Sequence, residues 1–264
     1  EDGIRDRPLS RGLGEVYNRQ EQVLPDIPNV GFGGDRFHRP FQTLGDMVEY
    51  TGSVMAIDPS GRGRDETGYA IVKMLNGFLF VHSCGGIRGG YGENVLKQLA
   101  LLAARYKVNE VIVESNFGDG MFSELFKPVI NAVHPVTMTE VRHNIQKEKR
   151  IIDTMEPVMN AHKLIVDLSV VKDDYTSCLS YPIEQQTKYT LIHQLSRITA
   201  EKGALLQDDR LDALAIAIGY WVEQMAANAD LKINDRKNEL LDIELNKFID
   251  TALGQKGRNQ NLWF

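Results

Sequence analysis

Cysteine and long apolar runs are both scarce in this sequence of 264 residues. Its two cysteines, Cys84 and Cys178, are too few and too far apart to suggest a disulfide framework or a zinc cage. No apolar run approaches the length needed to cross a bilayer, and no secretory signal opens the sequence. We therefore expect an intracellular protein with no membrane partner.

The chain also lacks an excess of basic charge. Its 30 Lys and Arg residues against 36 Asp and Glu residues give a net charge of −6, so the overall charge does not indicate binding to nucleic acid. The hydrophobic content of 42% and charged content of 25% are typical of a folded globular protein and exclude wholesale disorder.

Two families of catalytic motif are missing as well. No Gly-x-Ser-x-Gly elbow is present, so the sequence does not support nucleophilic serine chemistry. The glycine-rich stretch 85–92 lacks both the Gly-Lys-Ser/Thr ending of a P-loop and the dinucleotide spacing. We interpret this stretch as a flexible connector, and the chain as one without an ATPase motif.

Composition divides the chain into three parts. Residues 1–49 carry several prolines and little apolar periodicity, which predicts a linker or an N-terminal arm. Residues 50–228 contain the periodic segments of an organised domain. Residues 229–264 combine an amphipathic helix with a polar tail that ends in Trp263 and Phe264, aromatics that either dock on the chain itself or contact a partner.

Two apolar strands of the organised domain end in carboxylates. Residues 53–57 run directly into Asp58, and the β-branched run 111–113 ends in Glu114, as expected of an interior parallel strand. A returning strand at 68–75 and further strands alternate with helical patterns. This order predicts an α/β fold with a mixed central sheet and helices on its faces.

A third acidic element is the start of a helix rich in small residues. Asp209 and Asp212 lie three residues apart and share a face of this predicted helix. Asp212 stands among core-like neighbours, so its charge needs a partner or a metal ion. Helix capping is the alternative explanation for acids in a first turn, and turn formation is the alternative for Asp58.

The predicted helix 145–161 begins with basic residues. Lys147, Lys149 and Arg150 occupy its first turns, where cations oppose the helix dipole. This unfavourable placement suggests contact with phosphate and makes the three residues candidates for DNA binding. A solvated charged face is the alternative.

Mutually repelling carboxylates on three separate elements suggest a metal site. Asp58, Glu114, Asp209 and Asp212 provide the oxygen ligands that Mg²⁺ or Mn²⁺ takes, and two such ions could clamp both oxygens of a phosphodiester displacement. No corresponding set of His and Cys residues accompanies them, which argues against zinc.

The three acidic motifs in order resemble a known family. Ala-Ile-Asp-Pro-Ser-Gly around Asp58, Val-Ile-Val-Glu-Ser-Asn around Glu114, and Asp-Asp-Arg-Leu-Asp-Ala-Leu-Ala are similar to motifs in the nuclease domain of tailed-phage terminase large subunits, nearest to T7-type DNA maturases. The resemblance implies a ribonuclease H-like fold related to the RuvC resolvases. It also implies catalytic, metal-binding roles for Asp58, Glu114 and Asp209, with Asp212 as the more variable last acid.

The resemblance carries further expectations about function. It implies a hydrolase that cuts concatemeric viral DNA during genome packaging in the cytoplasm of an infected bacterium. Double-stranded DNA, the terminase ATPase domain, the small terminase subunit and the portal ring would then be the partners. Because no P-loop occurs here, we interpret the chain as the nuclease part of such a subunit.

Three other functions stay open at this stage. A Holliday-junction resolvase or an RNase H-type nuclease shares the same fold. A phosphotransferase of the actin and sugar-kinase type would need a second phosphate loop, which we do not find in the sequence. A non-catalytic module that docks on a portal or motor would leave the carboxylates as simple caps.

Overall fold

The computed structural model describes residues 48–60, 65–115 and 120–258, with only the backbone for 230, 232–235 and 246–258. The predictions for the N-terminal arm up to residue 47 and for the final aromatics lie outside these residues. The chain divides into two compact units, Glu1–Trp221 and Val222–Phe264. They are described separately.

The first unit contains a six-stranded mixed sheet in the order β5-β4-β1-β2-β3-β6. The three strands β1, β2 and β3 are antiparallel neighbours, whereas β4 pairs parallel with β1, β5 parallel with β4, and β6 parallel with β3. The strands are β1 (Gly52–Asp58), β2 (Glu66–Leu75), β3 (Phe78–Arg88), β4 (Glu110–Glu114), β5 (Thr137–Val141) and β6 (Leu164–Val166).

The register of the sheet brings two acidic strand ends together. Ile57 of β1 is the partner of Val113 in β4, so the next residues, Asp58 and Glu114, follow at the same edge of neighbouring parallel strands. Neighbouring strands lie about 4.8 Å apart, within reach of a shared cation. On the other side of Asp58, its antiparallel partner is Gly68 of β2.

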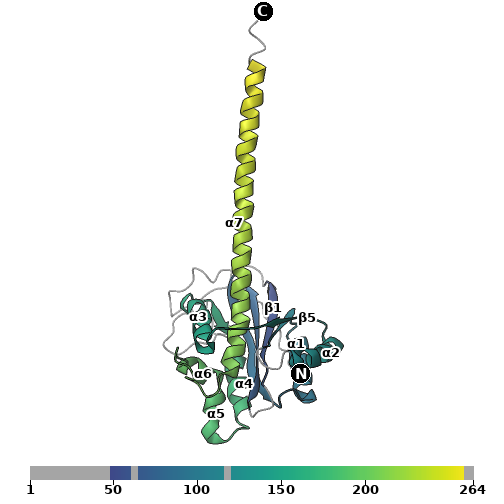
Figure 1. The fold of residues 1–264 in the computed structure, drawn as a ribbon, viewed down its shortest axis with the longest axis vertical. Helices are drawn as coiled ribbons and strands as arrows, with labels where there is room; N and C mark the ends of the chain where they lie inside the picture. The colour runs from purple at the N-terminus through teal and green to yellow at the C-terminus, as the bar shows by residue number, and fades with distance from the viewer. Residues whose placement is uncertain (1–47, 61–64, 116–119, 259–264) are drawn as a thin grey trace, which may run out of the picture. The chain divides into compact units, whose positions relative to one another are not determined.

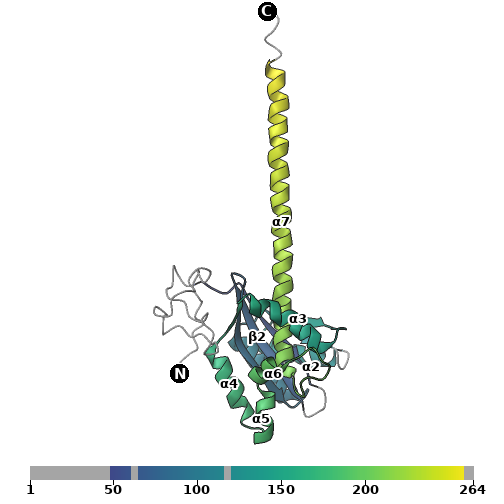
Figure 2. The same cartoon turned by 90° about the vertical axis from the view of Figure 1, so that its left-hand side faces the viewer.

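Helices cover both faces of this sheet (Figure 1). In Figures 1 and 2, α4, α5 and α6 lie together in one group, and in Figure 1 this group lies apart from α1 and α2. The helices are α1 (Glu93–Arg105), α2 (Met121–Val133), α3 (Lys147–Asn160), α4 (Leu168–Cys178), α5 (Ile183–Tyr189), α6 (Leu191–Arg197) and α7 (Asp209–Arg258).

The hydrophobic core follows from the alternation of the strands. On one face, buried residues of β1 and β4 such as Met55, Ile57 and Val111 pack with α1 and α2 in one cluster. The first turns of α7 are apolar around most of their circumference and are buried within the same unit. Trp221 fixes the end of this buried part, because its indole N–H donates to the carbonyl of Val72 at 3.1 Å.

Three expectations about secondary structure need correction. β3 continues through Arg88, so part of the glycine-rich stretch is strand and not a flexible connector, because its backbone pairs with β2. The sequence pattern of residues 187–199 predicts one amphipathic helix, but the structure interrupts it at Thr190, which leaves helical geometry and caps α6 through its side chain. The sequence interpretation also missed α4. Asp167 caps the start of this helix, because its side chain accepts a hydrogen bond from Ser169 N.

The second unit is the continuation of α7 from Val222. Its apolar side chains that the structure describes, including Leu231, Leu241 and Leu245, are exposed. Among the described residues, no helix has the length and apolar character required to traverse a bilayer.

Candidate metal centre

Carboxylates from three elements converge at the edge of the sheet where β1 and β4 end. Asp58, Glu114 and Asp212 each offer an oxygen, and these oxygens all lie within 4.8 Å of one another. Glu114 and Asp212 are buried, while Asp58 is partly exposed. Asp58 and Glu114 lie at the ends of β1 and β4, and Asp212 lies in the first turn of α7.

A close approach between backbones brings α7 to this position. A Cβ atom on Gly68 would lie 2.1 Å from the carbonyl oxygen of Asp209, so only glycine allows α7 to start here against β2. Gly68 is the strand partner of Asp58. The helix therefore begins beside the end of β1, and its first-turn carboxylates face the cluster.

Two basic side chains from α3 lie among the acids. The ammonium of Lys147 is 3.3 Å from Asp58 Oδ2, 3.0 Å from Asp208 Oδ1 and 2.9 Å from Asp212 Oδ2. The guanidinium of Arg150 is 2.5 Å from Asp212 Oδ1 and 3.4 Å from Glu114 Oε1. Four carboxylates thus share two cations.

The electrostatics of the cluster favour an additional cation. Burial raises the pKa of Asp58 to about 8, with Lys147 opposing the shift and Asp212 and Glu114 adding to it. Burial and then the charge of Asp212 raise the pKa of Glu114 to about 7, against the effect of Arg150. The pKa of Lys147 is raised by its acidic neighbours despite its burial. The environment therefore destabilises ionised carboxylates that lack a cation and stabilises positive charge next to them.

Asp209 does not belong to the three-acid group of Asp58, Glu114 and Asp212. Burial and the nearby charge of Asp58 raise the pKa of Asp209 to about 8, so it belongs to the same electrostatic site. Its buried Oδ2 has no hydrogen-bond partner among the described residues. Of the four predicted ligands, the structure gathers three within 4.8 Å, and the helix acid that completes the three is Asp212.

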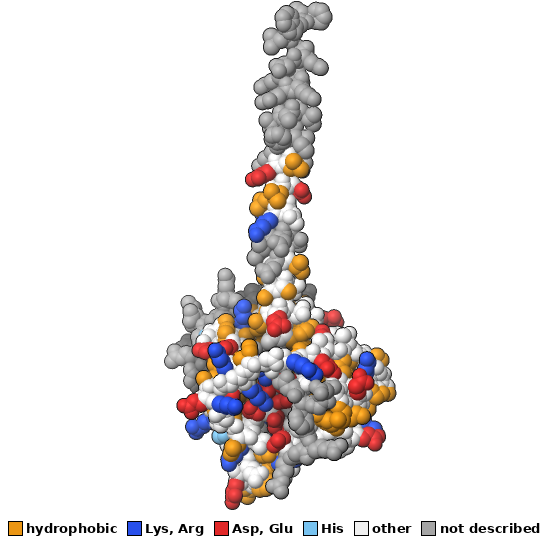
Figure 3. Space-filling view, viewed as in Figure 1, with side chains coloured by type: hydrophobic (Ala, Val, Ile, Leu, Met, Phe, Trp, Pro, Cys, Tyr) orange, Lys and Arg blue, Asp and Glu red, His pale blue; other side chains and the backbone are white. Residues whose placement is uncertain are grey.

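The predicted DNA-binding residues separate into two kinds. Lys147 and Arg150 point toward the acids, as their ion pairs show, whereas Lys149 between them is exposed. In Figure 3, acidic and basic side chains lie side by side in the middle of the visible face. The cations that oppose the dipole of α3 are thus stabilised by acids from other elements.

The sequence interpretation missed three features near this site. Asp208 contacts Lys147, and the Nδ1 of His143 lies 3.1 Å from Glu114 Oε1. Arg210 is fully buried and forms ion pairs with Glu66 and Asp174. The available signal was the core-like surroundings of Arg210, the same signal that singled out Asp212.

The donor set fits a hard divalent cation. The converging side chains present carboxylate oxygens, which are the ligands preferred by Mg²⁺ and Mn²⁺. The Lys147 ammonium already lies within 3.3 Å of three carboxylates, which demonstrates that positive charge is accommodated there. The buried Oδ2 of Asp209 provides a further acceptor close by.

Comparison with known proteins gives two matches in sequence. Residues 57–164 match the family model described as "Terminase Bacteriophage T7, Ribonuclease H-like domain". The chain is also 40% identical over 212 residues to the terminase large subunit of Enterobacteria phage T3. That alignment covers 80% of this chain but 36% of the relative, so the chain spans little more than a third of the relative's length.

Solved structures with partial similarity include three viral nuclease domains. The human cytomegalovirus terminase nuclease domain, soaked with Mn and inhibitor-bound, has a TM-score of 0.45 at 15% identity, covering 64% of this chain and 83% of that one. A mutant nuclease domain of the large terminase subunit of bacterial virus Sf6, with manganese and beta-thujaplicinol, has a TM-score of 0.43 at 15% identity, covering 64% and 88%. The large terminase nuclease of thermophilic phage G20c has a TM-score of 0.41 at 12% identity, covering 63% and 81%.

The sequence matches and the sheet lead to one assignment. The family model begins at Ile57, just before Asp58, and ends at Leu164, so it includes β4 with Glu114 and the basic start of α3. The mixed sheet with helices on its faces is the architecture expected from the sequence. Residues 57–164 of this chain therefore match the ribonuclease H-like domain family of T7-type terminases.

Proposed function

We propose that the chain is a divalent-metal-dependent DNA endonuclease, the nuclease part of a terminase large subunit that cuts concatemeric viral DNA. The observation that carries this proposal is the convergence of Asp58, Glu114 and Asp212 within 4.8 Å. The match of residues 57–164 to a terminase ribonuclease H-like family and the identity to the phage T3 subunit support it.

The proposed metal ligands are the four acids of the sequence prediction. Asp58, Glu114 and Asp212 would hold Mg²⁺ or Mn²⁺ directly, and Asp209, beside Asp58, would complete the ligand set if two ions bind. When bound, such ions stabilise the charge on the attacking and leaving oxygens of a phosphodiester and supply a nucleophile from water.

The basic residues have a different task in this proposal. Lys147 and Arg150 reduce the repulsion between the carboxylates and hold them at the short separations observed. Lys149 is exposed on the same turn, so it is free to contact a phosphate of the DNA backbone. The chain binds DNA weakly by itself, because its net charge is −6 and binding depends on Lys and Arg contacts to phosphate.

The wider context of the reaction follows from the relative. A terminase large subunit implies double-stranded DNA as substrate and a packaging assembly as partner. We infer that the ATPase motor, the small terminase subunit and the portal ring are the partners, in the cytoplasm of the infected host. We place the nuclease in residues 50–228, with residues 229–264 available for such contacts.

Plasmid nicking tests this function. Supercoiled DNA incubated with the chain should be nicked and linearised with millimolar Mg²⁺ or Mn²⁺, and left intact in EDTA. The Asp58→Asn variant, prepared in parallel, controls for contaminating nucleases. No cleavage by the wild type with either ion contradicts the proposal, and cleavage confined to four-way junctions would assign the chain to the resolvases.

A further inference from the structure

We propose that Arg210 is a positioning residue for the metal centre. By binding Glu66 of β2 and Asp174 of α4, it fixes the first turn of α7 and thereby the carboxylate of Asp212. This inference rests on the proposed metal-binding role of the acidic cluster.

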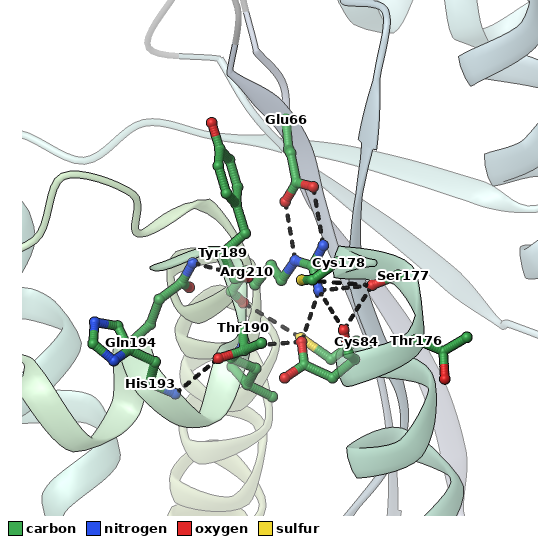
Figure 4. Close-up of polar contacts among 12 residues, drawn as sticks. Glu66, Cys84, Thr176, Ser177, Cys178, Tyr189, Thr190, His193, Gln194 and Arg210 are labelled. Atoms are coloured by element: carbon green, nitrogen blue, oxygen red, sulfur yellow. Dashed lines mark hydrogen bonds and ion pairs between the residues drawn. The ribbon is translucent and has the colours of Figure 1, made fainter. Parts of the chain in front are cut away.

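The Arg210 side chain is fully buried and its guanidinium is fully engaged. Its Nε and Nη2 donate to the two oxygens of the Glu66 carboxylate, both at 2.9 Å. Its Nη1 donates to Asp174 Oδ1 at 2.7 Å and to Ser177 Oγ at 2.9 Å. Figure 4 shows the guanidinium between Glu66 and the residues of α4. A planar fork held at both ends fixes its orientation as well as its position.

Glu66 connects this contact to the metal centre through the sheet. It is the first residue of β2, two positions before Gly68, which is the strand partner of Asp58. A Cβ atom at Gly86 of β3 would lie 2.0 Å from Glu66 Oε2, so the glycine leaves room for this carboxylate. Tyr181 also donates its hydroxyl to Glu66 Oε1. The strand that touches the start of α7 is thus also the strand that holds Arg210.

The backbone of the same turn is held independently. The side-chain oxygen of the fully buried Gln194 accepts a hydrogen bond from Leu211 N at 3.0 Å. This N–H belongs to the first turn of α7 and has no partner within the helix. The thiol of Cys84 donates to the carbonyl of Arg210 at 3.4 Å. Contacts from β3 and α6 therefore fix the peptide group that joins Arg210 and Leu211, the two residues between Asp209 and Asp212.

Stability alone is a weak explanation for this buried ion cluster. Replacing buried ion pairs by apolar residues of similar volume often leaves folding stability unchanged or increases it. The presence of a directional ionic contact at Arg210 therefore needs an explanation other than stability. The reason offered by the sequence is spacing: Arg210 lies one residue after Asp209 and two before Asp212. A shift of the first turn would move both carboxylates away from Asp58 and Glu114.

The alternative is that the cluster only fastens α4 and α6 to the sheet. Under that alternative, a folded variant with a weakened cluster retains normal affinity for a divalent ion. Under the positioning role it loses affinity, because partners that orient metal ligands typically contribute 10- to 100-fold.

The test is Mn²⁺ binding, measured calorimetrically on the full chain without DNA, with folding verified by circular dichroism. Arg210→Lys keeps the charge but cannot bridge Glu66 and Asp174 as a fork. Gly68→Ala keeps every charge and forces the first turn of α7 away from β2. We expect at least about tenfold weaker Mn²⁺ binding in both. Ser177→Ala, the mildest change, should give a smaller loss in the same direction.

Tyr220→Phe is the matched control. It removes another hydrogen bond from α7 to a strand carboxylate, from the Tyr220 hydroxyl to Glu110 Oε2 at 2.7 Å, and should leave Mn²⁺ affinity unchanged. Folded Arg210→Lys and Gly68→Ala proteins that bind Mn²⁺ like the wild type overturn the inference. If either does not fold, the other and Ser177→Ala decide. A wild type that binds Mn²⁺ without cutting DNA would refute the proposed function but leave this comparison valid.

Discussion

Two clusters of buried charge meet at the first turn of α7, and they differ in how accessible they are to solvent. In the acidic cluster, Asp58, Glu114, Asp208 and Asp212 share Lys147 and Arg150. In the second cluster, the guanidinium of Arg210 binds both oxygens of Glu66 and one of Asp174. One helix turn therefore carries acids into the first cluster and a cation into the second.

This difference distinguishes a candidate cation site from a closed ionic contact. The Arg210 cluster is closed, because its members are nearly inaccessible to solvent and its guanidinium nitrogens all have partners. In the acidic cluster, Asp58 is partly exposed, and the burial and acidic neighbours that raise the pKa of its carboxyl favour a further cation beside it. Buried charge alone does not identify a metal site, whereas converging carboxylates at an edge that solvent reaches make a site a candidate.

Removing one acid from the first cluster should have the largest effect on activity. We expect Asp58→Asn, Glu114→Gln and Asp212→Asn each to reduce DNA cleavage by more than about 100-fold, because each removes a proposed metal ligand. Initial rates of plasmid nicking with Mg²⁺ measure this effect. Asp153→Asn, which removes an exposed carboxylate of α3, is the control and should cut normally.

For Asp209→Asn we expect a loss of cleavage smaller than that of Asp212→Asn. Asp209 lies outside the three-acid group, although its pKa responds to Asp58. Equal and complete loss in both variants would make Asp209 as essential as the gathered acids. Wild-type cleavage by Asp212→Asn would remove that residue from the site.

Breaking the second cluster should have the largest effect on stability. Arg210→Met leaves two buried carboxylates without their cation, which costs about 3–5 kcal/mol of unfolding free energy. Asp58→Asn should instead leave stability unchanged or increase it, because it removes repulsion between carboxylates. Urea denaturation in EDTA measures both variants, and a larger loss for Asp58→Asn than for Arg210→Met would invert the comparison.

The sequence was sufficient to predict the elements that bear the acids. The apolar runs before Asp58 and Glu114 predict two strand ends, and the structure confirms them as β1 and β4. The parallel register of these strands then makes their acids neighbours, which is a property of sheets and not of any one residue.

Other parts of the site depend on contacts that sequence patterns do not encode. The choice between Asp209 and Asp212 depends on how α7 is rotated, which is set by the contact at Gly68 and the ion pairs of Arg210. The partners of Arg210 come from Glu66 and Asp174, distant in sequence and on different elements. The basic residues at the start of α3 led to a prediction of DNA binding. Only the structure shows that one of them, Lys147, forms an ion pair with Asp212.

Changing pH should affect the acidic cluster with a defined sign. Burial raises the pKa of Asp58 and Asp209 to about 8 and that of Glu114 to about 7, compared with about 4 in an unfolded chain. Between about pH 4 and 8 the folded metal-free protein therefore holds more protons, so its unfolding free energy falls as pH rises through that window.

Denaturation in EDTA between pH 5 and 9 measures this fall. Asp58→Asn should show a shallower decline, since one of the responsible groups is gone. Divalent ions require ionised carboxylates, so Mn²⁺ affinity should rise over the same window. Identical pH profiles for the wild type and Asp58→Asn would show that Asp58 does not titrate in this range.

The smallest effect is expected outside both clusters, at Lys149. Because its side chain is exposed, Lys149→Gln should weaken DNA binding about equally for all sequences and reduce the salt slope by about one. Binding measured with Ca²⁺ in place of Mg²⁺ tests this without the cleavage expected under Mg²⁺. An unchanged salt slope would assign Lys149 to the solvated face of α3.

The most direct test of the account is the thermal stabilisation of the chain by Mn²⁺, compared between the wild type and Asp58→Asn. A cation bound in the folded state stabilises it by mass action, and this readout depends on neither DNA nor turnover. We predict that millimolar Mn²⁺ raises the Tm of the wild type and has a much smaller effect on Asp58→Asn. An equal rise in both proteins, or none in the wild type, would contradict the claim that the acids at the ends of β1 and β4 form the metal site.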